Sequence, residues 1–334
     1  MTLDFTASRR RFGATALALA GLLAAPGAAW AQTYPAQMVR LIVGFPAGGP
    51  SDVLTRQFAP ALEKELGQTV IVENIGGAGG TIAAARVLRA PADGYQVLVG
   101  SPMELIQAPI SMLGTNFASD DFRLTGMVIN TDLLLVSRKD LPYDSVDQLV
   151  SAAKGSGYSP LSYGSVGYGS LYHLAGEYFA KQAGIELLHV PYRGAGPIIQ
   201  DLMGGQIDLA FIPLAGPVLN LVETGALKPI ALAGPQRHAL LPNIPLIDES
   251  AGFDDFAFDI WAALTVPKGT PENVMVTLND ALARALTYPE VKQGLESTGS
   301  RVAQKMSIAE QAQLYANEVD RYQKIAKLVG IEPQ

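Results

Sequence analysis

The feature that most constrains this chain is a loop design that occurs three times: a short apolar strand, a glycine-containing loop and the start of a helix. The three stretches are Leu41–Asp52, Val70–Thr81 and Leu161–Ser170. The unpaired backbone amides and the dipole of a helix N-terminus favour anions, so a strand that leads through glycines into such a terminus is suited to hold one. No catalytic constellation accompanies these loops in the sequence, which indicates a binding site rather than a reaction centre.

The first 31 residues have the pattern of an export signal. Arg9–Arg11 form a charged region, Ala14–Ala25 is apolar but too short to span a bilayer, and Ala29–Ala31 reads Ala-Trp-Ala, a typical cleavage site. Ser8–Phe12 fits a twin-arginine signal, and an arginine-rich Sec signal fits equally well. We expect cleavage near Ala31 and a mature protein in the periplasm.

Composition excludes several classes of function. The chain of 334 residues contains no cysteine, so neither a disulfide framework nor a thiolate metal site is possible. Its net charge of −7 argues against nucleic acid as a partner, because nucleic acids bind basic surfaces. Beyond the signal no apolar run of 18 residues is free of charge, so we expect no membrane span.

The alternation of strand and helix patterns predicts the fold class. Strands at Val39–Phe45, Thr69–Glu73 and Gln96–Gly100 alternate with helices at Asp52–Leu66 and Thr81–Ala90. A strand–helix–strand order of this kind is typical of a parallel sheet covered by helices. The first part of the mature chain is therefore predicted to be an α/β unit.

A second α/β unit follows a short connection. The predicted strands Leu124–Ile129 and Leu133–Ser137 are separated only by Asn130–Asp132, so the chain either makes a hairpin or passes to a second lobe there. Two similar halves predict an α/β fold of two lobes, each a mixed sheet flanked by helices, around a cleft. We assign residues 32–131 and 234–334 to lobe 1 and residues 132–233 to lobe 2. The further predicted elements are helices at Val146–Lys154, Ser170–Ala183, Ile198–Met203, Val218–Thr224, Glu272–Leu286 and Ile308–Leu328, and strands at Leu161–Tyr163, Leu187–Pro191, Leu209–Ile212, Leu227–Ala233 and Ile260–Val266.

Nucleotide and metal sites are not supported by the motifs. Gly77–Ile82 has isoleucine where a G-x-G-x-x-G fingerprint needs glycine, and no P-loop motif occurs. None of the three histidines has another histidine four residues away, and no H-E-x-x-H occurs, so we expect no metal and no cofactor. His173 is expected to be a packed or capping side chain.

Some residues in the loops allow two interpretations. Ser165 resembles a nucleophile elbow, but Tyr163 stands where the motif G-x-S-x-G needs glycine. Asp52 is either an N-cap or first-turn acid, or a residue that orients the loop amides. The aromatic residues at strand ends and in loops either pack in the core or cover a small ligand; they are Phe45, Tyr168, Tyr192 and Phe211.

The motifs of the chain, taken in order, resemble the Bug family of solute receptors for tripartite tricarboxylate transporters. The resemblance covers essentially all of the mature sequence. The stretches that carry it are Tyr34-Pro35, Arg40–Val43, Phe45–Gly49 with Asp52, Val72–Asn74, Gly77–Gly80, Asp93–Tyr95, His173–Glu177, His189–Gly194, Gly204–Asp208 and Pro267–Pro271.

The resemblance implies a periplasmic binding-protein fold with a two-strand hinge and closure on the ligand. It implies a small carboxylate held by main-chain amides and ordered water, then delivered to the membrane components of the transporter. The implied contacts come from the loop Phe45–Asp52 (Phe45, Ala47, Gly48, Gly49 and Asp52), from Ser101, and from the loop Gly164–Ser170 (Gly164, Ser165, Gly167, Tyr168 and Ser170), with Tyr192–Gly194 and Phe211–Leu214 on the far side.

The sequence departs from the family pattern where ligand identity is decided. Ser101–Glu104 stands where relatives usually carry small hydroxyl and glycine residues, and Phe211–Ala215 replaces a more polar stretch. Glu104 is either a solvated surface acid or a carboxylate at the mouth of the cleft that repels dicarboxylates.

We therefore predict a non-enzymatic, monomeric receptor for a small organic acid. One alternative is an exported hydrolase or transferase that uses Ser165 or Ser101, and catalysis would then need a base within hydrogen-bond reach of the serine. A second alternative is an accessory that presents its ligand to a membrane sensor.

Overall fold

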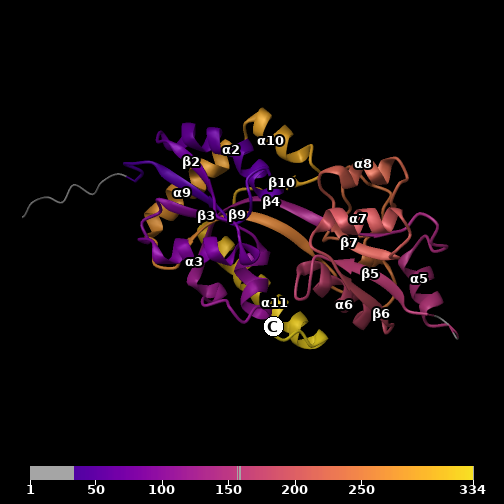
Figure 1. Cartoon of the computed structure of the whole chain (residues 1–334). Coiled ribbons are helices and arrows are strands. Elements are labelled where there is room, and N and C mark those ends of the chain that lie inside the picture. Colours follow the sequence, from indigo (N-terminus) through magenta and orange to yellow (C-terminus); the bar gives the residue numbers. More distant parts are fainter. Residues whose placement is uncertain (1–33, 156, 158, 334) are drawn as a thin grey trace, which may run out of the picture.

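The computed structural model describes residues 34–155, 157 and 159–333 (Figure 1). The predicted export signal lies outside these residues. The described strands form a curled mixed sheet with the order β2-β1-β3-β9-β4-β7-β5-β6, and β8 and β10 also pair with β4. No described helix is long and apolar enough to cross a membrane.

The first lobe is a three-layer unit built on three parallel strands. Leu41 and Val43 pack on one face of the sheet, in a cluster with α2 and α9, whereas Ile42 packs on the other face with α3. Burial on both faces explains why Leu41–Val43 of β1 is a continuous apolar run. The elements are β1 (Val39–Val43), α2 (Pro50–Leu66), β2 (Val70–Asn74), α3 (Thr81–Arg89), β3 (Gln96–Gly100), α4 (Ala108–Ser111), β9 (Asp259–Pro267), α9 (Glu272–Ala285), α10 (Pro289–Glu296) and β10 (Arg301–Val302).

The second lobe repeats the design around β5, which pairs in parallel with β6 and β7. Ile212 of β7 packs in a cluster with α7 and α8, whereas Phe211 points to the opposite face, in the cluster that contains α6. The elements are α5 (Val146–Ala153), β5 (Leu161–Ser165), α6 (Leu171–Ala183), β6 (Leu187–Pro191), α7 (Ala195–Met203), β7 (Leu209–Pro213), α8 (Pro217–Glu223) and β8 (Lys228–Ala233).

The strand β4 (Phe122–Ser137) runs from one lobe to the other, as Figure 1 shows in the centre of the molecule. Residues 122–132 pair with β9, and residues 133–137 pair with β7 and β8. The prediction of two separate strands was therefore wrong, and so was the hairpin alternative. Asn130–Asp132 stay extended because β9 supplies ladder partners for them.

The chain returns between the lobes near Phe258. The Phe258 amide donates to Ala233, and the Leu133 amide donates to Phe258, so the return lies beside β4. Phe253 stacks on Phe179 of α6 and Phe256 packs edge to face against it, which places the residues before this return against the second lobe.

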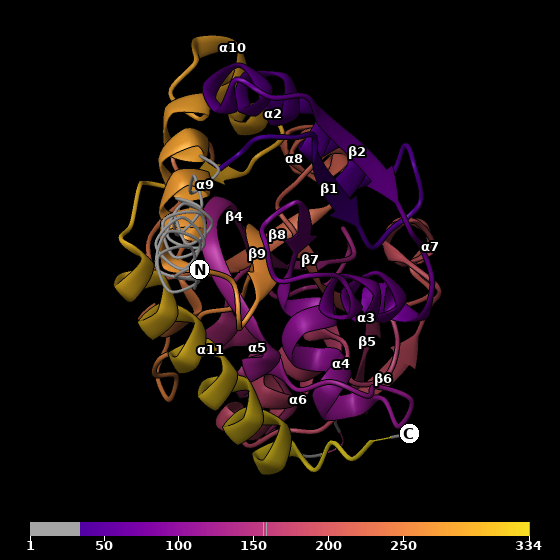
Figure 2. The same cartoon turned by 90° about the vertical axis from the view of Figure 1, so that its left-hand side faces the viewer.

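The long C-terminal helix α11 (Ile308–Val329) bridges the two lobes. It contacts both β4 and α6, and Figure 2 shows it lying along one side of the molecule. The Tyr315 hydroxyl donates to the Ser119 carbonyl at 2.9 Å, and the Tyr315 ring packs against Trp261. Ser307 caps the helix in a capping box with Glu310.

Candidate functional site

The residues predicted to bind ligand lie at the carboxyl ends of parallel strands in both lobes. In the first lobe β1 and β3 run parallel, so the loops after Val43 and Gly100 share one edge of the sheet. In the second lobe β5 and β7 run parallel, so the loops after Ser165 and Pro213 also share an edge. Ligands in α/β folds bind outside the carboxyl ends of strands, and these edges are therefore the candidate site.

The loop between β1 and α2 is organised by the carboxylate of Asp52. This buried side chain accepts a hydrogen bond from the Gly48 amide at 2.8 Å and one from Arg56 at 2.9 Å. The hydrogen bond from Arg56, followed by the one from Gly48, lowers the pKa of Asp52 to about 2. The helix is capped by Gly49, so Asp52 is not the N-cap; it is a first-turn acid that also orients the loop.

The amides of the two loop glycines are already used inside the loop. Gly48 donates to Asp52, and Gly49 donates to the Pro46 carbonyl at 3.2 Å. Within the described part of the chain, the amides of Ser51 and Asp52 have no acceptor. In the observed conformation, the amides that are available to an anion are therefore those in the first turn of α2.

Glu104 is neither of the two alternatives that the sequence left open. It is fully buried, and its carboxylate accepts hydrogen bonds from the Ser101 amide at 2.5 Å and the Ser101 hydroxyl at 2.6 Å. The prediction of a surface acid was wrong, because residues 102–111 fold into a π-helical turn and α4 instead of an exposed loop. Burial raises the pKa of Glu104 to about 7. Both donors of Ser101 are directed to this carboxylate.

The loop between β5 and α6 is tightly hydrogen-bonded. The Ser165 hydroxyl contacts both the amide and the carbonyl of Gly167 at 3.1 Å, and the Ser170 hydroxyl donates to the Gly167 carbonyl at 2.6 Å. Ser170 also caps α6 by accepting from the His173 amide. Among the described residues, the amides of Leu171 and Tyr172 have no acceptor. The second lobe thus offers the same kind of helix N-terminus as the first.

Two histidines, His173 and His189, contact this loop. His173 is buried, as predicted for a packed side chain, but its contact with His189 and with the loop was not predicted. His189 of β6 lies 2.6 Å from the Ser165 hydroxyl through Nε2, and His173 accepts from the Gly169 amide through Nδ1 at 3.0 Å. The two imidazole rings stack with centroids 4.0 Å apart. Burial is the main cause that lowers the pKa of each histidine to about 4. His189 reaches this position because it pairs with Tyr163 across β5 and β6. A pairing between two strands cannot be predicted from a local sequence motif.

These contacts place a base beside each of the two serines that the hydrolase alternative needs. His189 contacts Ser165, and Glu104 contacts Ser101. Ser165 is fully buried, however, and among the described residues no carboxylate lies within hydrogen-bond distance of His189. Neither pair reproduces a serine–histidine–carboxylate triad.

Of the two residues expected on the far side of the cleft, Tyr192 lies beside the loop after β5, where its amide donates to the Ser165 carbonyl at 2.8 Å, whereas Phe211 does not. The Tyr192 hydroxyl donates to Asp201 of α7 at 2.6 Å. Phe211 is 1% exposed and packs against Phe179 and Phe256, so the structure does not bring it to the loops. The alternation of β7 explains the difference, because it turns Phe211 toward α6 and into the core.

The first lobe contacts the candidate loop of the second lobe through α4. A Cβ atom placed on Gly169 would lie 2.2 Å from the Cβ of Ser111, and one on Gly79 would lie 3.8 Å from the sulfur of Met112. The chain directly after α4 therefore contacts the loop after β2 in the first lobe, and α4 itself contacts the loop after β5 in the second.

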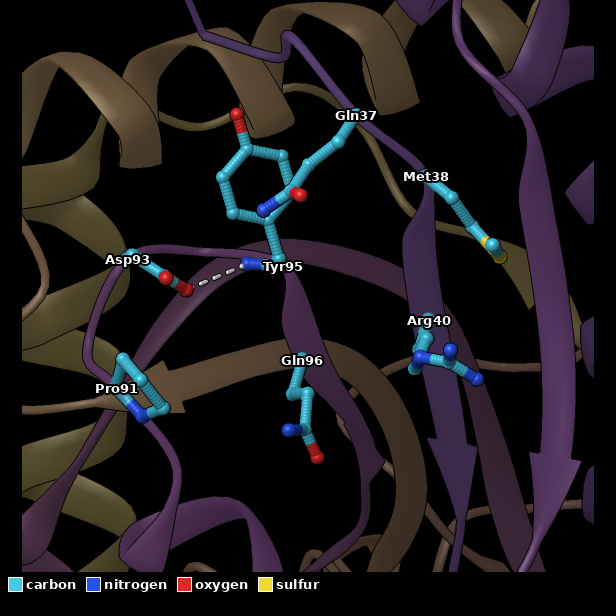
Figure 3. A pocket seen from close by; sticks show the side chains of 7 residues that line it. All are labelled: Gln37, Met38, Arg40, Pro91, Asp93, Tyr95 and Gln96. Carbon is cyan, nitrogen blue, oxygen red and sulfur yellow. Dashed lines mark hydrogen bonds between the residues drawn. The ribbon is translucent and has the colours of Figure 1, made fainter.

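A separate pocket of about 360 Å³ lies at the opposite edge of the first lobe (Figure 3). Residues at the amino ends of β1 and β3, including Arg40 and Gln96, line it together with Asp93, which accepts from the Tyr95 amide. This pocket is remote from the candidate loops. Within the described residues no group of three or more histidine, aspartate or glutamate side chains is arranged to hold a metal ion.

Solved structures identify the class of protein. The protein Rpa4515 of R. palustris, solved with adipate, is 30% identical and has a TM-score of 0.76 over 90% of this chain and 100% of that one. MatC (Rpa3494) from Rhodopseudomonas palustris, solved with bound malate, is 28% identical with a TM-score of 0.73 over 87% and 99% of the two chains. The predicted fold of a two-lobed periplasmic binding protein is confirmed.

Sequence comparisons identify the family. Residues 54–331 match the family described as Tripartite tricarboxylate transporter family receptor, TctC. Protein BugT of Bordetella pertussis is 31% identical over 319 residues, which are 94% of this chain and 95% of that protein. The chain belongs to the TctC family of periplasmic solute receptors, and the predicted resemblance to the Bug family is confirmed.

Proposed function

We propose that this protein is a periplasmic receptor that captures a small carboxylate between its lobes and delivers it to the membrane components of a tripartite tricarboxylate transporter. Membership of the TctC family supports the receptor role, and the adipate and malate in two similar structures support a carboxylate as ligand. The observation that carries the proposal is that α2 and α6 both begin at a glycine-containing loop with unpaired amides.

The ligand is held by local dipoles in this proposal, because the chain carries a net charge of −7 and does not attract anions by its overall field. Arg56 lies near the start of α2 but is paired with Asp52 and Asn74. The amides of Ser51 and Asp52 in lobe 1, and of Leu171 and Tyr172 in lobe 2, are the proposed donors.

Export, the lobe boundaries and the absence of catalysis belong to the same proposal. We propose that residues 1–31 are removed after export by the Sec or the Tat route. We propose that the chain enters lobe 2 at residue 132 and leaves it near Phe258, so residues 234–257, assigned to lobe 1 from the sequence, belong with lobe 2. No catalytic role is assigned to Ser165, and delivery to a transporter is preferred to presentation to a sensor on family grounds alone.

A thermal-shift screen against succinate, malate, adipate and a set of aromatic and monocarboxylic acids tests the proposal. A ligand that binds only the folded protein at a hundredfold excess over its dissociation constant adds about 2.7 kcal/mol to the free energy of unfolding. We expect at least one carboxylate to raise the melting temperature and uncharged amides of the same acids to have no effect. A protein that none of these acids stabilises would contradict a carboxylate receptor.

A pair of glycine variants locates the site. Gly49→Val places a Cβ atom 3.1 Å from the Pro46 carbonyl oxygen, at the start of α2, whereas Gly269→Val places one in ordinary contact with Ala92, at the other edge of the sheet. We expect Gly49→Val to abolish the ligand-induced shift and Gly269→Val to retain it. Equal affinities in both variants would exclude the loop before α2 as the site.

A further inference from the structure

We propose that His173 and His189 are positioning residues that hold the loop between Ser165 and Ser170 in the conformation that presents the amides at the start of α6 to the ligand. The inference rests on the proposed function for the identity of the site. In this proposal the two histidines contact the loop and do not contact the ligand.

The first step of the argument is that each histidine holds one end of the loop. Nε2 of His189 contacts the Ser165 hydroxyl at 2.6 Å, where β5 ends. Nδ1 of His173 accepts from the Gly169 amide at 3.0 Å, just before the helix begins. Gly167 and Gly169 have φ angles of 124° and 70°, a backbone conformation that glycine adopts freely and other residues rarely adopt. Because glycine restricts its backbone so little, contacts from other residues must hold the loop in one conformation.

The second step is that the two imidazoles belong to one rigid stack. Tyr163 of β5 stacks on His189, His189 stacks on His173, and Tyr168 of the loop packs on His173 with ring centroids 4.9 Å apart. The Tyr163 hydroxyl donates to Glu177 at 2.7 Å, which anchors the inner end of the stack to α6. Movement of either histidine therefore moves the loop.

The third step is that the contact depends on protonation. Because Nδ1 of His173 accepts a hydrogen bond, this imidazole must carry its proton on Nε2, and an imidazolium has no acceptor left. Two imidazoliums 4.0 Å apart would also repel each other. Among the described residues, Glu177 of α6 is the charged group that faces the pair, 3.8 Å from His173, and the neutral groups are Tyr163, Tyr168 and Ser165.

The positioning role can be separated from mere packing by conservative variants. Asparagine at position 173 offers an acceptor where Nδ1 stands, and glutamine at position 189 offers a polar group where Nε2 stands, whereas leucine fills the space without either. We expect His173→Leu to weaken carboxylate binding by about tenfold or more and His173→Asn to stay within about threefold of wild type, because the unpaired Gly169 amide lets the loop rearrange only in the leucine variant.

Amide hydrogen exchange of the ligand-free mature protein gives a test that needs no ligand. We expect the Gly169 amide to be protected at pH 7 in wild type and in His173→Asn, and to exchange freely in His173→Leu. In wild type the protection should fall as the pH approaches 4, where His173 takes up its proton. Full protection of Gly169 in His173→Leu, or at pH 4 in wild type, would overturn the proposal, and the wild-type titration decides it if the leucine variant does not fold.

Binding of malate and adipate measured from pH 7.5 to pH 4.5 gives the second readout. The ligand titrates in the same way with both proteins, so its titration cancels in the ratio of the wild-type affinity to the affinity of His173→Asn/His189→Gln. We expect this ratio to fall as the pH is lowered to 4.5. A constant ratio would overturn the positioning role. If neither acid binds while Gly169 behaves as expected, the proposed function fails for these ligands and the positioning of the loop stands.

Discussion

Asp132 and Arg301 form a bidentate ion pair at the point where β4 passes from one lobe to the other. The Asp132 side chain is fully buried, and Arg301 of β10 covers it. Beside the pair, the hydroxyls of Thr131 and Ser300 lie 2.8 Å apart. Burial raises the pKa of Asp132 in spite of the arginine, so this carboxylate depends on its partner to stay ionised.

Removal of Arg301 is expected to destabilise the protein strongly. Arg301→Met leaves the Asp132 carboxylate buried and unpaired, which costs about 3 kcal/mol in the free energy of unfolding. The double variant Asp132→Asn/Arg301→Met should lose less than the sum of the two single variants, because no charge is then left unpaired. Urea unfolding midpoints measure both. Additive losses would mean that the two side chains do not act as a pair.

Glu104→Gln is expected to stabilise the protein at alkaline pH. The pKa of Glu104 is raised from its ordinary value of 4.5 to about 7, so its contribution to stability is fully present below pH 4.5 and is lost as the pH rises through 7. Glutamine imitates the protonated acid and should add about 2 kcal/mol at pH 8 and almost nothing at pH 4.5.

The matched control for Glu104 is Glu186→Gln, which changes an exposed carboxylate that has no ion-pair partner among the described residues. Thermal unfolding of both variants between pH 4.5 and pH 8 gives the comparison. The same gain in both variants, or a gain for Glu104→Gln that is larger in acid, would contradict the assignment.

The buried His173 is expected to make the protein less stable at acid pH, whereas Glu104 makes it less stable at alkaline pH. The pKa of His173 is lowered from 6.5 to about 4, so the unfolded chain takes up the proton first. The stability contribution is therefore complete above pH 6.5 and is lost as the pH falls toward 4. Between pH 7 and pH 4.5 the free energy of unfolding of the wild type should fall by roughly 2–3 kcal/mol more than that of His173→Asn. An unchanged pH slope would show that the pKa of His173 in the folded protein stays near its ordinary value.

Gly169→Ala is expected to disturb the contact between the lobes. Gly169 and Gly184 have φ angles of 70° and 64°, so alanine at either position carries a similar backbone strain. Only the alanine at 169 meets an obstacle, because its Cβ would lie 2.2 Å from that of Ser111, whereas nothing lies within 4 Å at 184.

The rate of ligand dissociation measures this effect. We expect dissociation to be about tenfold faster in Gly169→Ala, to be unchanged in Gly184→Ala, and to be restored by the second change Ser111→Gly. Small-angle scattering should show a larger radius of gyration for Gly169→Ala with ligand. Identical rates in the two alanine variants would show that the contact between Gly169 and Ser111 does not limit closure.

The sequence by itself predicted most of the elements and the class of protein. Helix α5 begins at the predicted Val146, α6 begins one residue after the predicted Ser170, which caps it, and β6 spans the predicted residues Leu187–Pro191. These features depend on contacts within about four residues, or on apolar periodicity, and both can be read from a single chain. The ordered motifs then identified the family.

Only the tertiary structure decided what the residues of the site do. Gly48 uses its amide for Asp52, Glu104 is buried against Ser101, and Phe211 lies in the core. The pair of His173 and His189 exists because β6 lies beside β5 and α6 packs over both. These outcomes depend on strand register and on which face of a strand is turned toward a helix, and residues distant in the sequence supply both conditions. Local patterns therefore predict where the loops are, and packing decides which of their polar groups are left for a ligand.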